Sequence, residues 1–455
     1  MRSSTRFLQA ACAAVLVLGL GPAAQATAAP DDPLPLPVVQ GIDKAIPPAP
    51  IPHLATIPPR AYNAGFDQAT LETRAALLPA YTGDRFFDQW PSGLDTKKPG
   101  QLLEKRDVTP VGRLLSIVPT AKVTQIKFRT TDSHDAPSFG TATIITPANV
   151  WKGPGARPIL VNDIPIVSLG AQCSPGYSFA HGYSTKTSTF NFIPPDTINA
   201  LLNGYEVILP DHEGPRMAYG EPTVAGRITL DSLRAMGQVE PKDFAKRRTA
   251  LTGYSGGAIA VHGTVKEIDS YAPELKPQLV GAALGGVPAD FHMLVNSMNG
   301  NLAAGIFLAA ELGIAREHPE MLTIMNNAGK WLSTSPVKDF CGVQAGRIAI
   351  PVPTQVFSSD PDPYHSPVAD MVYKETGLKN IKAGTPLFIY QGVNEWWIPV
   401  QGAINLHVEQ CRLGANSSFT LVPGEHAIGA LTGYPAQWNW LERRLNGIPA
   451  PNGCA

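Results

Sequence analysis

A serine flanked by glycines is the group in this chain best suited to covalent chemistry. Ser255 lies in the segment GYSGG (residues 253–257), which has the form G-x-S-x-G. A short apolar run, 250–252, precedes the segment, and small residues compatible with a helix follow it. This order of strand, sharp turn and helix is typical of a nucleophile elbow, in which the serine hydroxyl stands clear at the end of a strand. The backbone N–H of Gly256, at the start of the helix, would then donate to a developing oxyanion.

Two further groups are needed to activate a serine, namely a general base and a carboxylate that orients the base. The apolar run 387–390 has the character of a late strand, and Glu395 is the carboxylate in the loop that follows it. His426 follows the last apolar run, 419–422, and so stands behind the acid in the chain. A serine, an acid and a histidine in this order, each after a strand, predict a catalytic triad of Ser255, Glu395 and His426.

The members of this predicted triad have rivals. Three other carboxylates precede the late strand instead of following it: Asp360, Asp362 and Asp370. His212 follows an earlier apolar run and competes with His426 as the base, although a role in organising a loop is the preferred interpretation. Ser255 could also lie idle in a glycine-rich turn, but the acid and the histidine downstream favour catalysis.

A tetrahedral intermediate needs a second oxyanion donor besides Gly256. In hydrolases with a nucleophile elbow, this donor comes from the loop after an early strand. Here the early strand is the apolar run 159–162, and Asp163 comes directly after it. The backbone N–H of Asp163 is therefore the predicted second donor.

The elements that must position these residues alternate between apolar strands and helices. Residues 123–129 and 141–147 have the pattern of a strand pair. Further short apolar runs bounded by Gly, Pro or Asp are typical of buried strands: 159–162, 206–210, 250–252, 279–284, 387–390 and 419–422. Helical stretches such as 225–236 and 257–265 come between them. This alternation predicts an α/β fold around a mostly parallel sheet, with helices on both faces.

Composition and pattern divide the chain into five segments. Residues 1–28 combine two arginines, an apolar run and small residues suited to cleavage, which is typical of a secretory signal peptide. Residues 29–84 are rich in proline and are expected to form an extended or disordered leader. Residues 85–287 and 383–455 carry the predicted strands of the core. Residues 288–382 interrupt the alternation and are predicted to form a cap or lid, with ordinary packing of helices against the sheet as the alternative.

The predicted cap contains two helix candidates, 302–312 and 320–332. The first is unusually apolar, and above a catalytic sheet such a helix could line a tunnel for an acyl chain. Phe307 and Leu308 are the side chains we expect to set the length of the chain that fits.

The cysteines and the overall charge bound the class of protein further. One of the five cysteines falls in the signal segment, which leaves Cys173, Cys341, Cys411 and Cys454. Four cysteines in an exported protein predict two disulfides, with three connectivities open at this point. Their spacing fits no zinc pattern, and neither a metal nor an organic cofactor is expected. The net charge of −1 offers no argument for binding nucleic acid.

Short motifs distributed over most of the chain resemble the secretory lipase family. The similarity runs from about residue 85 to the C-terminus. Its motifs are Gln172–Tyr177, Asp211–Gly214, Gly253–Gly257, Ser270–Leu275 followed by Gly285 and Gly286, Glu395–Pro399, Glu409–Cys411, and His426 with Gly433 and Trp440. Each motif is short, but together, in this order and spacing, they are specific.

The resemblance implies an α/β-hydrolase with a helical cap, acting on lipid-like esters. It places the nucleophile at Ser255 and the base at His426, with Glu395 at the position where the family usually has aspartate. It also implies the disulfide pairs Cys173–Cys341 and Cys411–Cys454.

The expected function is that of a secreted serine carboxylester hydrolase, most readily a lipase, that works through an acyl-enzyme. A broad esterase or an acyltransferase acting on another acylated substrate is the enzymatic alternative, because the same triad serves all of these reactions. A binding protein that keeps the fold without catalysis is the alternative from another class. The expected partner is a small-molecule or lipid ester, met by a monomer at a lipid–water interface.

Overall fold

A single sheet organises the molecule and carries the residues of interest at the ends of its strands. A computed structural model describes residues 29–187, 195–349 and 351–454. The predicted signal peptide, residues 1–28, lies outside the described residues. The strands are β1 (Leu102–Asp107), β2 (Thr120–Thr131), β3 (Pro137–Pro147), β4 (Ile159–Asp163), β5 (Glu206–Pro210), β6 (Thr249–Tyr254), β7 (Leu279–Gly285), β8 (Leu387–Gly392) and β9 (Ser417–Val422).

The nine strands lie in the order β1-β2-β3-β5-β4-β6-β7-β8-β9. The first three pair antiparallel, and β3 pairs antiparallel with β5. From β5 to β9 every pairing is parallel. The carboxyl ends of β4, β6 and β8 therefore lie along one edge of the sheet, and this arrangement brings the loops after them together. The predicted mostly parallel sheet is confirmed.

The strands β4 to β8 are almost fully buried, on both faces of the sheet, which explains their continuous hydrophobic runs. In β4, Ile159 and Val161 join the apolar cluster on one face, whereas Leu160 between them joins the cluster on the other. In β6, Leu251 and Ala250 divide between the two clusters in the same way. This alternation follows from the two-residue period of a strand.

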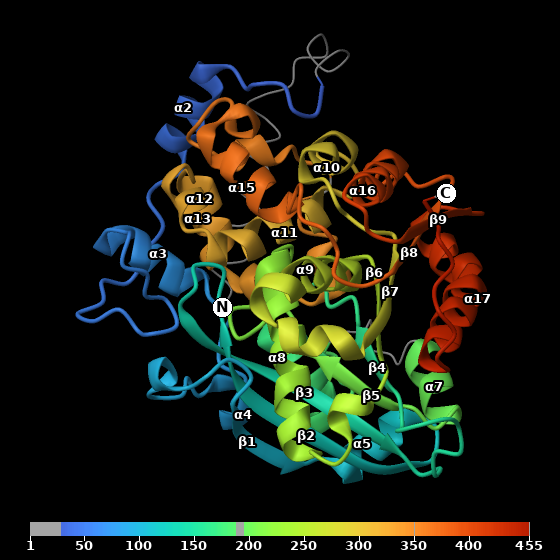
Figure 1. Ribbon diagram of the computed structural model, residues 1–455. Coiled ribbons are helices and arrows are strands. Elements are labelled where there is room, and N and C mark those ends of the chain that lie inside the picture. Colours follow the sequence, from blue (N-terminus) through green and yellow to red (C-terminus); the bar gives the residue numbers. More distant parts are fainter. Residues whose placement is uncertain (1–28, 188–194, 350, 455) are drawn as a thin grey trace.

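Helices cover both faces of the sheet and extend above it (Figure 1). The α-helices before β7 are α2 (Leu36–Ala45), α3 (Gln68–Leu77), α4 (Arg85–Asp88), α5 (Thr109–Ser116), α6 (Pro175–His181), α7 (Pro195–Leu202), α8 (Pro222–Val239) and α9 (Gly256–Tyr271). Those after β7 are α10 (Phe291–Met298), α11 (Ala304–Glu317), α12 (Glu320–Thr323), α13 (Asn327–Thr334), α14 (Gly342–Ala345), α15 (Pro367–Gly377), α16 (Val400–Arg412) and α17 (His426–Leu445). Short 3-10 turns are η1 (Leu94–Thr96), η2 (Ala171–Cys173), η4 (Phe244–Lys246), η5 (Pro273–Gln278), η6 (Pro336–Asp339), η7 (Thr354–Phe357) and η8 (Pro363–His365).

The helices α8 and α9 pack on one face of the sheet at very close range. A Cβ added to Gly263 in α9 would lie 1.8 Å from the carbonyl oxygen of Pro222 in α8, so only glycine permits this approach. The opposite face is covered by α7 and α17, with Trp440, Leu441 and Leu445 of α17 buried against it. The expectation of helices on both faces is met.

Between β7 and β8 the chain leaves the sheet and forms a group of helices above it, α10 to α15, which appear in yellow to orange at the top of Figure 1. The predicted helix 302–312 corresponds to α11, which begins two residues later and runs on to Glu317. The predicted helix 320–332 is wrong in its length, because the chain divides into α12 and α13. Asn326 causes the division, since its side chain caps the N-terminus of α13 by accepting from the N–H of Gly329.

The edge strand β1 was not predicted from the sequence. Four of the six residues in its segment, LLEKRD, are charged and the strand is only partly buried, so it lacks the apolar run by which the other strands were found. Charged side chains are common on edge strands, where they discourage pairing with another chain.

The proline-rich N-terminal segment is folded against the helices of the 288–382 region. The expectation of an extended leader is wrong for α2 and α3, which lie beside α12, α13 and α15 in Figure 1. The Asp43 carboxylate accepts from the N–H of Asn327 at 2.8 Å. The indole N–H of Trp331 donates to the carbonyl of Pro47, also at 2.8 Å. Ile42 adds an apolar contact with Ala328.

A buried arginine joins four parts of the chain. The Arg316 guanidinium, at the end of α11, donates to the carbonyls of Leu77, Leu169, Arg216, Met217 and Lys338. Burial lowers the pKa of Arg316 to about 9, so the side chain remains a cation at neutral pH. This one side chain therefore fixes the N-terminal segment, the loops after β4 and β5, and the helical region to one another.

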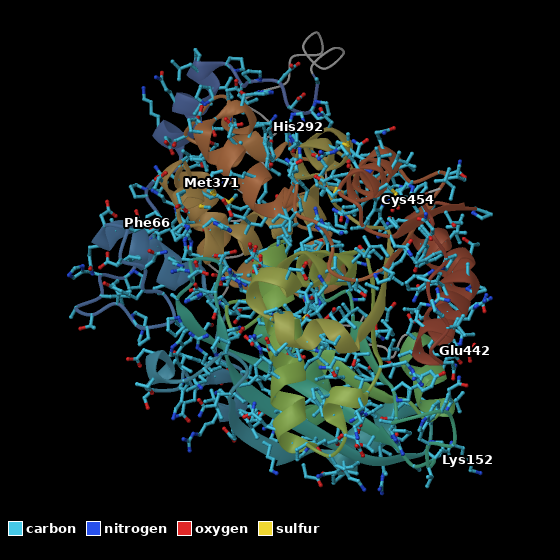
Figure 2. All side chains as sticks on the ribbon, viewed as in Figure 1. Phe66, Lys152, His292, Met371, Glu442 and Cys454 are labelled. Atoms are coloured by element: carbon cyan, nitrogen blue, oxygen red, sulfur yellow. A yellow bond between two sulfur atoms is a disulfide. The ribbon has the colours of Figure 1, made fainter. Side chains whose placement is uncertain are left out.

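Both disulfides implied by the family resemblance are present. Cys173 is bonded to Cys341, with 5.5 Å between the Cα atoms, and this bridge ties the loop after β4 to the segment before α14. Cys411 is bonded to Cys454, and this bridge holds the C-terminal tail beside α16 and β9. Figure 2 labels Cys454 at that edge of the molecule.

Candidate active site

Ser255 occupies the sharp turn between β6 and α9. Its backbone has φ 54° and ψ −120°, a conformation rarely adopted by residues other than glycine, and its N–H donates to the carbonyl of Gly285 at 2.9 Å. The turn is closed so tightly that a Cβ on Gly257 would lie 1.8 Å from the carbonyl oxygen of Asp163. The predicted nucleophile elbow is thus the local structure around Ser255.

His426 is the first residue of α17 and connects Ser255 to Glu395. Its Nε2 lies 2.9 Å from the Ser255 hydroxyl oxygen, and its Nδ1 lies 2.6 Å from Oε2 of Glu395. Since a carboxylate only accepts, the proton between the last two groups belongs to Nδ1, and Nε2 is left to accept from the serine hydroxyl. The three residues predicted from their order in the sequence therefore meet in one hydrogen-bonded line.

Glu395 is held from two sides in the loop after β8. Its Oε1 accepts from the backbone N–H groups of Trp397 and Ile398, at 3.0 and 3.3 Å. Its side chain has no solvent-exposed surface, so these hydrogen bonds and His426 replace the water that an anion would otherwise need.

Aromatic rings fix the position of the histidine. The ring of Trp397 stacks on that of His426 with the centroids 5.1 Å apart and an interplanar angle of 19°. The hydroxyl of Tyr254, next to the serine in the chain, donates to the backbone carbonyl of His426 at 2.5 Å. Neither aromatic residue was singled out from the sequence, although both are adjacent to or near predicted site residues.

Asp163 ends β4, the strand next to the one that leads into Ser255. The side chain is fully buried, its Oδ1 accepts from the Thr229 hydroxyl at 3.1 Å, and Oδ2 has no hydrogen-bond partner among the described residues. Burial raises the pKa of Asp163 well above its ordinary value, against the opposing effect of the Thr229 hydrogen bond. Burial therefore disfavours the charged form of this side chain.

The rival residues have other partners. The buried ring of His212 contacts the carbonyl of Ile164 through Nε2 at 2.9 Å, and burial lowers its pKa to about 4. This contact organises the loop after β4, as the preferred interpretation expected. The rival carboxylates, Asp360, Asp362 and Asp370, lie between η7 and the first turn of α15, whereas Glu395 is the carboxylate that contacts His426.

A cavity of about 120 Å³ lies within the helices above the sheet. Apolar side chains from α10, α11 and α15 line most of it, including Phe307 and Leu308. Glu311 is a carboxylate in this lining, and it accepts from the hydroxyls of Thr354 and Tyr364, both at 3.1 Å. Burial raises the pKa of Glu311 to about 7. The sequence pattern pointed to the apolar helix but not to this polar group within it.

Comparison with known proteins identifies relatives of the chain. The profile of the family described as secretory lipase matches residues 185–453. Lipase A from Moesziomyces aphidis is 31% identical, over 81% of this chain and 81% of its own. Lipase 10 from Candida albicans is 29% identical, over 82% of each chain.

The fold is also similar to that of a solved lipase. The crystal structure of Candida antarctica lipase A in its closed state superposes with a TM-score of 0.72 and 26% identity, over 83% of this chain and 89% of the other. The expected α/β-hydrolase fold is confirmed by this match. The chain belongs to the secretory lipase family.

Proposed function

We propose that the protein hydrolyses carboxylic esters of lipid acyl chains, with Ser255 as nucleophile, His426 as general base and acid, and Glu395 as the group that orients the histidine. The observation that carries this proposal is the unbroken line of hydrogen bonds from Ser255 through His426 to Glu395. The elbow that presents the serine supports it, because the strained backbone at Ser255 is typical of a functional turn.

In the proposed reaction, His426 Nε2 takes the proton of the Ser255 hydroxyl as its oxygen attacks the ester carbonyl. The same proton then passes to the leaving alkoxide, and an acyl-enzyme remains on Ser255. His426 then takes a proton from water as the water oxygen attacks the acyl carbonyl, and it gives this proton to Ser255 Oγ as the acyl bond breaks, which releases the fatty acid and restores the serine. Glu395 stabilises the imidazolium that forms in both steps without itself taking the proton.

The oxyanion that forms in each step would be held by the backbone N–H of Gly256, at the start of α9. We retain Asp163 as the source of the second donor, through its backbone N–H.

Residues 288–382 would act as the cap, and its apolar cavity would receive the acyl chain. The lining by Phe307, Leu308 and other apolar side chains supports this role, since each buried methylene contributes roughly 0.8 kcal/mol. The N-terminal segment 29–84 would brace the outer side of the cap through α2 and α3.

The site would work at a lipid–water interface, outside the cell. Exposed apolar side chains stand on the two elements that carry the acid and the base: Val393 and Trp396 in the loop of Glu395, and Ile428 and Leu431 in the first turns of α17. Their position supports docking on a lipid surface. The predicted signal peptide supports export. No helix in the described parts of the chain is long and apolar enough to cross a membrane.

A fluorophosphonate probe and a series of p-nitrophenyl esters test the proposal. The probe should label the parent protein at Ser255, and Ser255→Ala should lose labelling together with about a million-fold of kcat. His426→Ala should lose a similar factor, whereas a folded His212→Ala should keep ester hydrolysis. The assignment would be overturned if the probe labelled Ser255→Ala. It would also be overturned if His212→Ala lost activity to the extent expected for a triad residue while His426→Ala remained active.

A further inference from the structure

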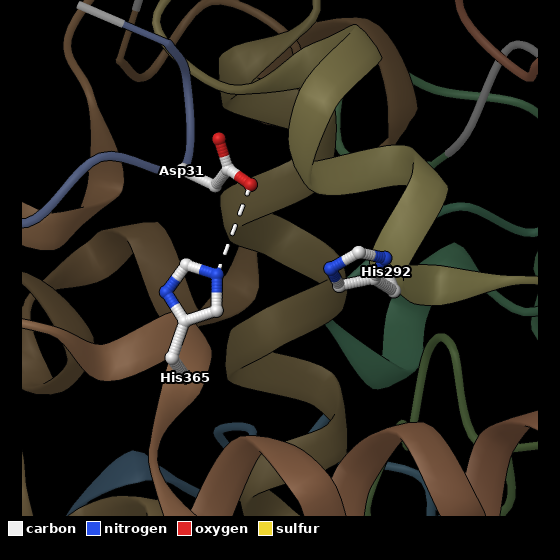
Figure 3. A group of neighbouring side chains, drawn as sticks. All are labelled: Asp31, His292 and His365. Carbon is white, nitrogen blue, oxygen red and sulfur yellow. Dashed lines mark ion pairs between the residues drawn. The ribbon is translucent and has the colours of Figure 1, made fainter.

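Three side chains that are far apart in the sequence meet at the outer rim of the cap (Figure 3). Asp31 belongs to the N-terminal segment, His292 to the first turn of α10, and His365 to η8. One carboxylate oxygen and one nitrogen of each ring all lie within 4.8 Å of one another. The two histidines are exposed and Asp31 is half-buried, so the group is open to solvent. Figure 2 labels His292 near the top of the molecule.

The orientation of His365 is fixed by a fourth residue. Its Nδ1 lies 2.7 Å from Oδ1 of Asp362, and because the carboxylate only accepts, Nδ1 carries the proton of this hydrogen bond. The lone pair of a neutral ring is then on Nε2, which faces Oδ2 of Asp31 across 3.9 Å. This distance is too long for a hydrogen bond. A carboxylate that orients a histidine in this way is the usual support of a metal-binding imidazole.

The spacing and the ligand types suit a transition-metal ion. Zinc binds imidazole nitrogen at about 2.0–2.1 Å and carboxylate oxygen at about 2.0–2.2 Å, so two ligands of a tetrahedral ion lie about 3.4 Å apart. The 3.9 Å between His365 Nε2 and Asp31 Oδ2 needs only a small rotation of two surface side chains to reach that value. Two imidazoles and one carboxylate favour Zn²⁺ over Mg²⁺ or Ca²⁺, with water as the fourth ligand.

We infer that Asp31, His292 and His365 form a divalent-metal site, occupied by Zn²⁺, that clasps the N-terminal segment to the cap. His292 follows Phe291 in the chain and His365 follows Tyr364, and both Phe291 and Tyr364 line the cap cavity. The ion would therefore hold together two elements that form the cavity, α10 and η8. The site takes no part in ester cleavage and does not depend on the proposed function.

A second group of potential ligands serves as an internal control. His134, His318 and Glu320 also lie within 4.8 Å of one another. However, Nε2 of His134 already contacts the carbonyl of Glu317 at 2.7 Å, and His318 is buried with its Nε2 3.6 Å from Oε1 of Glu221. The carbonyl contact engages Nε2 of His134, and burial separates the ring of His318 from solvent, so we expect no binding there.

Calorimetric titration with Zn²⁺ tests the inference, using full-length protein without a polyhistidine tag, stripped by chelator. The parent protein should bind one ion per chain, and Ser255→Ala should bind it equally, which separates this test from that of hydrolysis. His292→Ala and His365→Ala should each weaken binding at least tenfold, and Asp362→Asn by roughly 10-fold to 100-fold. His134→Ala should leave the affinity unchanged. Substituted Co²⁺ should give the absorption of a tetrahedral complex, and Zn²⁺ should raise the Tm of the parent protein.

Stoichiometric binding that depends on His292 and His365 supports the site. The inference is overturned if the parent protein binds no ion stoichiometrically, or if binding survives in both histidine variants. It is also overturned if binding is lost in His134→Ala instead. Should an alanine variant fail to fold in the chelator-treated control, the Asp362→Asn protein, which keeps all three ligands, decides the outcome through its affinity.

Discussion

At the scale of single residues, Glu395 shows how a longer acid is fitted into the position where related lipases are expected to have aspartate. In this loop, Oε1 of Glu395 accepts from the N–H groups of Trp397 and Ile398, while Oε2 contacts Nδ1 of His426. The loop therefore supplies two of the three hydrogen bonds that hold the anion.

Glu395→Gln should lower kcat by a factor on the order of a thousand to ten thousand, because the amide cannot stabilise the imidazolium and can favour the wrong tautomer of His426. Glu395→Asp should keep substantial activity, since it retains the charge. Steady-state hydrolysis of a p-nitrophenyl ester measures both effects. Full activity in Glu395→Gln would transfer the acid's role to Asp360, Asp362 or Asp370.

A second residue-scale prediction concerns Glu311 and pH. The folded chain keeps this carboxyl protonated up to about pH 7, whereas the unfolded chain releases the proton near its ordinary pKa of 4.5. Between these two pH values the folded state binds more protons than the unfolded state. The contribution of Glu311 to the free energy of unfolding therefore falls as the pH rises from 4.5 to 7. Relative to the parent protein, Glu311→Gln should gain stability between pH 4.5 and 8, with a limit of about 3 kcal/mol. Denaturant unfolding of both proteins at the two pH values measures the difference, and identical pH dependence would contradict it.

At the scale of elements, the elbow between β6 and α9 is built on a contact that leaves no space. Gly257→Ala should cost about 3 kcal/mol or more, because its Cβ would lie 1.8 Å from the backbone oxygen of Asp163. The matched control is Gly256→Ala, since the nearest atom to a Cβ there is 3.5 Å away. Denaturant unfolding compares the two proteins. Equal stability in both variants would show that the elbow tolerates a shift of β4.

The helix α11 should determine which acyl chains are accepted. Phe307→Trp or Leu308→Trp would shorten the cavity, and each methylene excluded should lower kcat/KM for long esters about fourfold relative to short ones. Labelling by a small fluorophosphonate should not change. Leu302→Ser is the control, because this side chain is 68% exposed at the start of the same apolar stretch. If both tryptophan variants kept the chain-length preference of the parent protein, the cavity would not be the site that binds the acyl chain.

At the scale of the whole molecule, the parts predictable from sequence are those with a local signal. The parallel strands were found because burial on both faces gives an unbroken apolar run, and the triad because each member follows a strand in a fixed order. β1 was missed because an edge strand carries charges. The fold of the N-terminal segment was missed because its proline content is typical of an extended chain, whereas contacts with Asn327 and Trp331 hold it in place.

The features that no local pattern marks are those assembled from distant segments. Arg316 contacts carbonyls from residue 77 to residue 338, and the proposed metal ligands are 31, 292 and 365. Single ligands or donors at such separations have no periodicity or motif. Glu311 is not predicted for a different reason. It lies in an apolar helix, and a single polar residue does not change the pattern that its neighbours set.

The disulfide Cys173–Cys341 has a mechanical consequence for the cap. The cap region is already attached to the sheet at both of its ends, through β7 and β8, and this bridge adds a covalent anchor near its middle. A region anchored at three points cannot rotate away from the sheet as one rigid body about a single hinge. Any opening of this region would therefore divide at the anchor, with α10 to α13 on one side and α15 on the other, unless the proposed metal site joins α10 to η8. Reduction of the bond would remove the middle anchor and leave the attachments at β7 and β8 and the hydrogen bonds of Arg316, so substrate entry would change while Ser255, His426 and Glu395 stay in place.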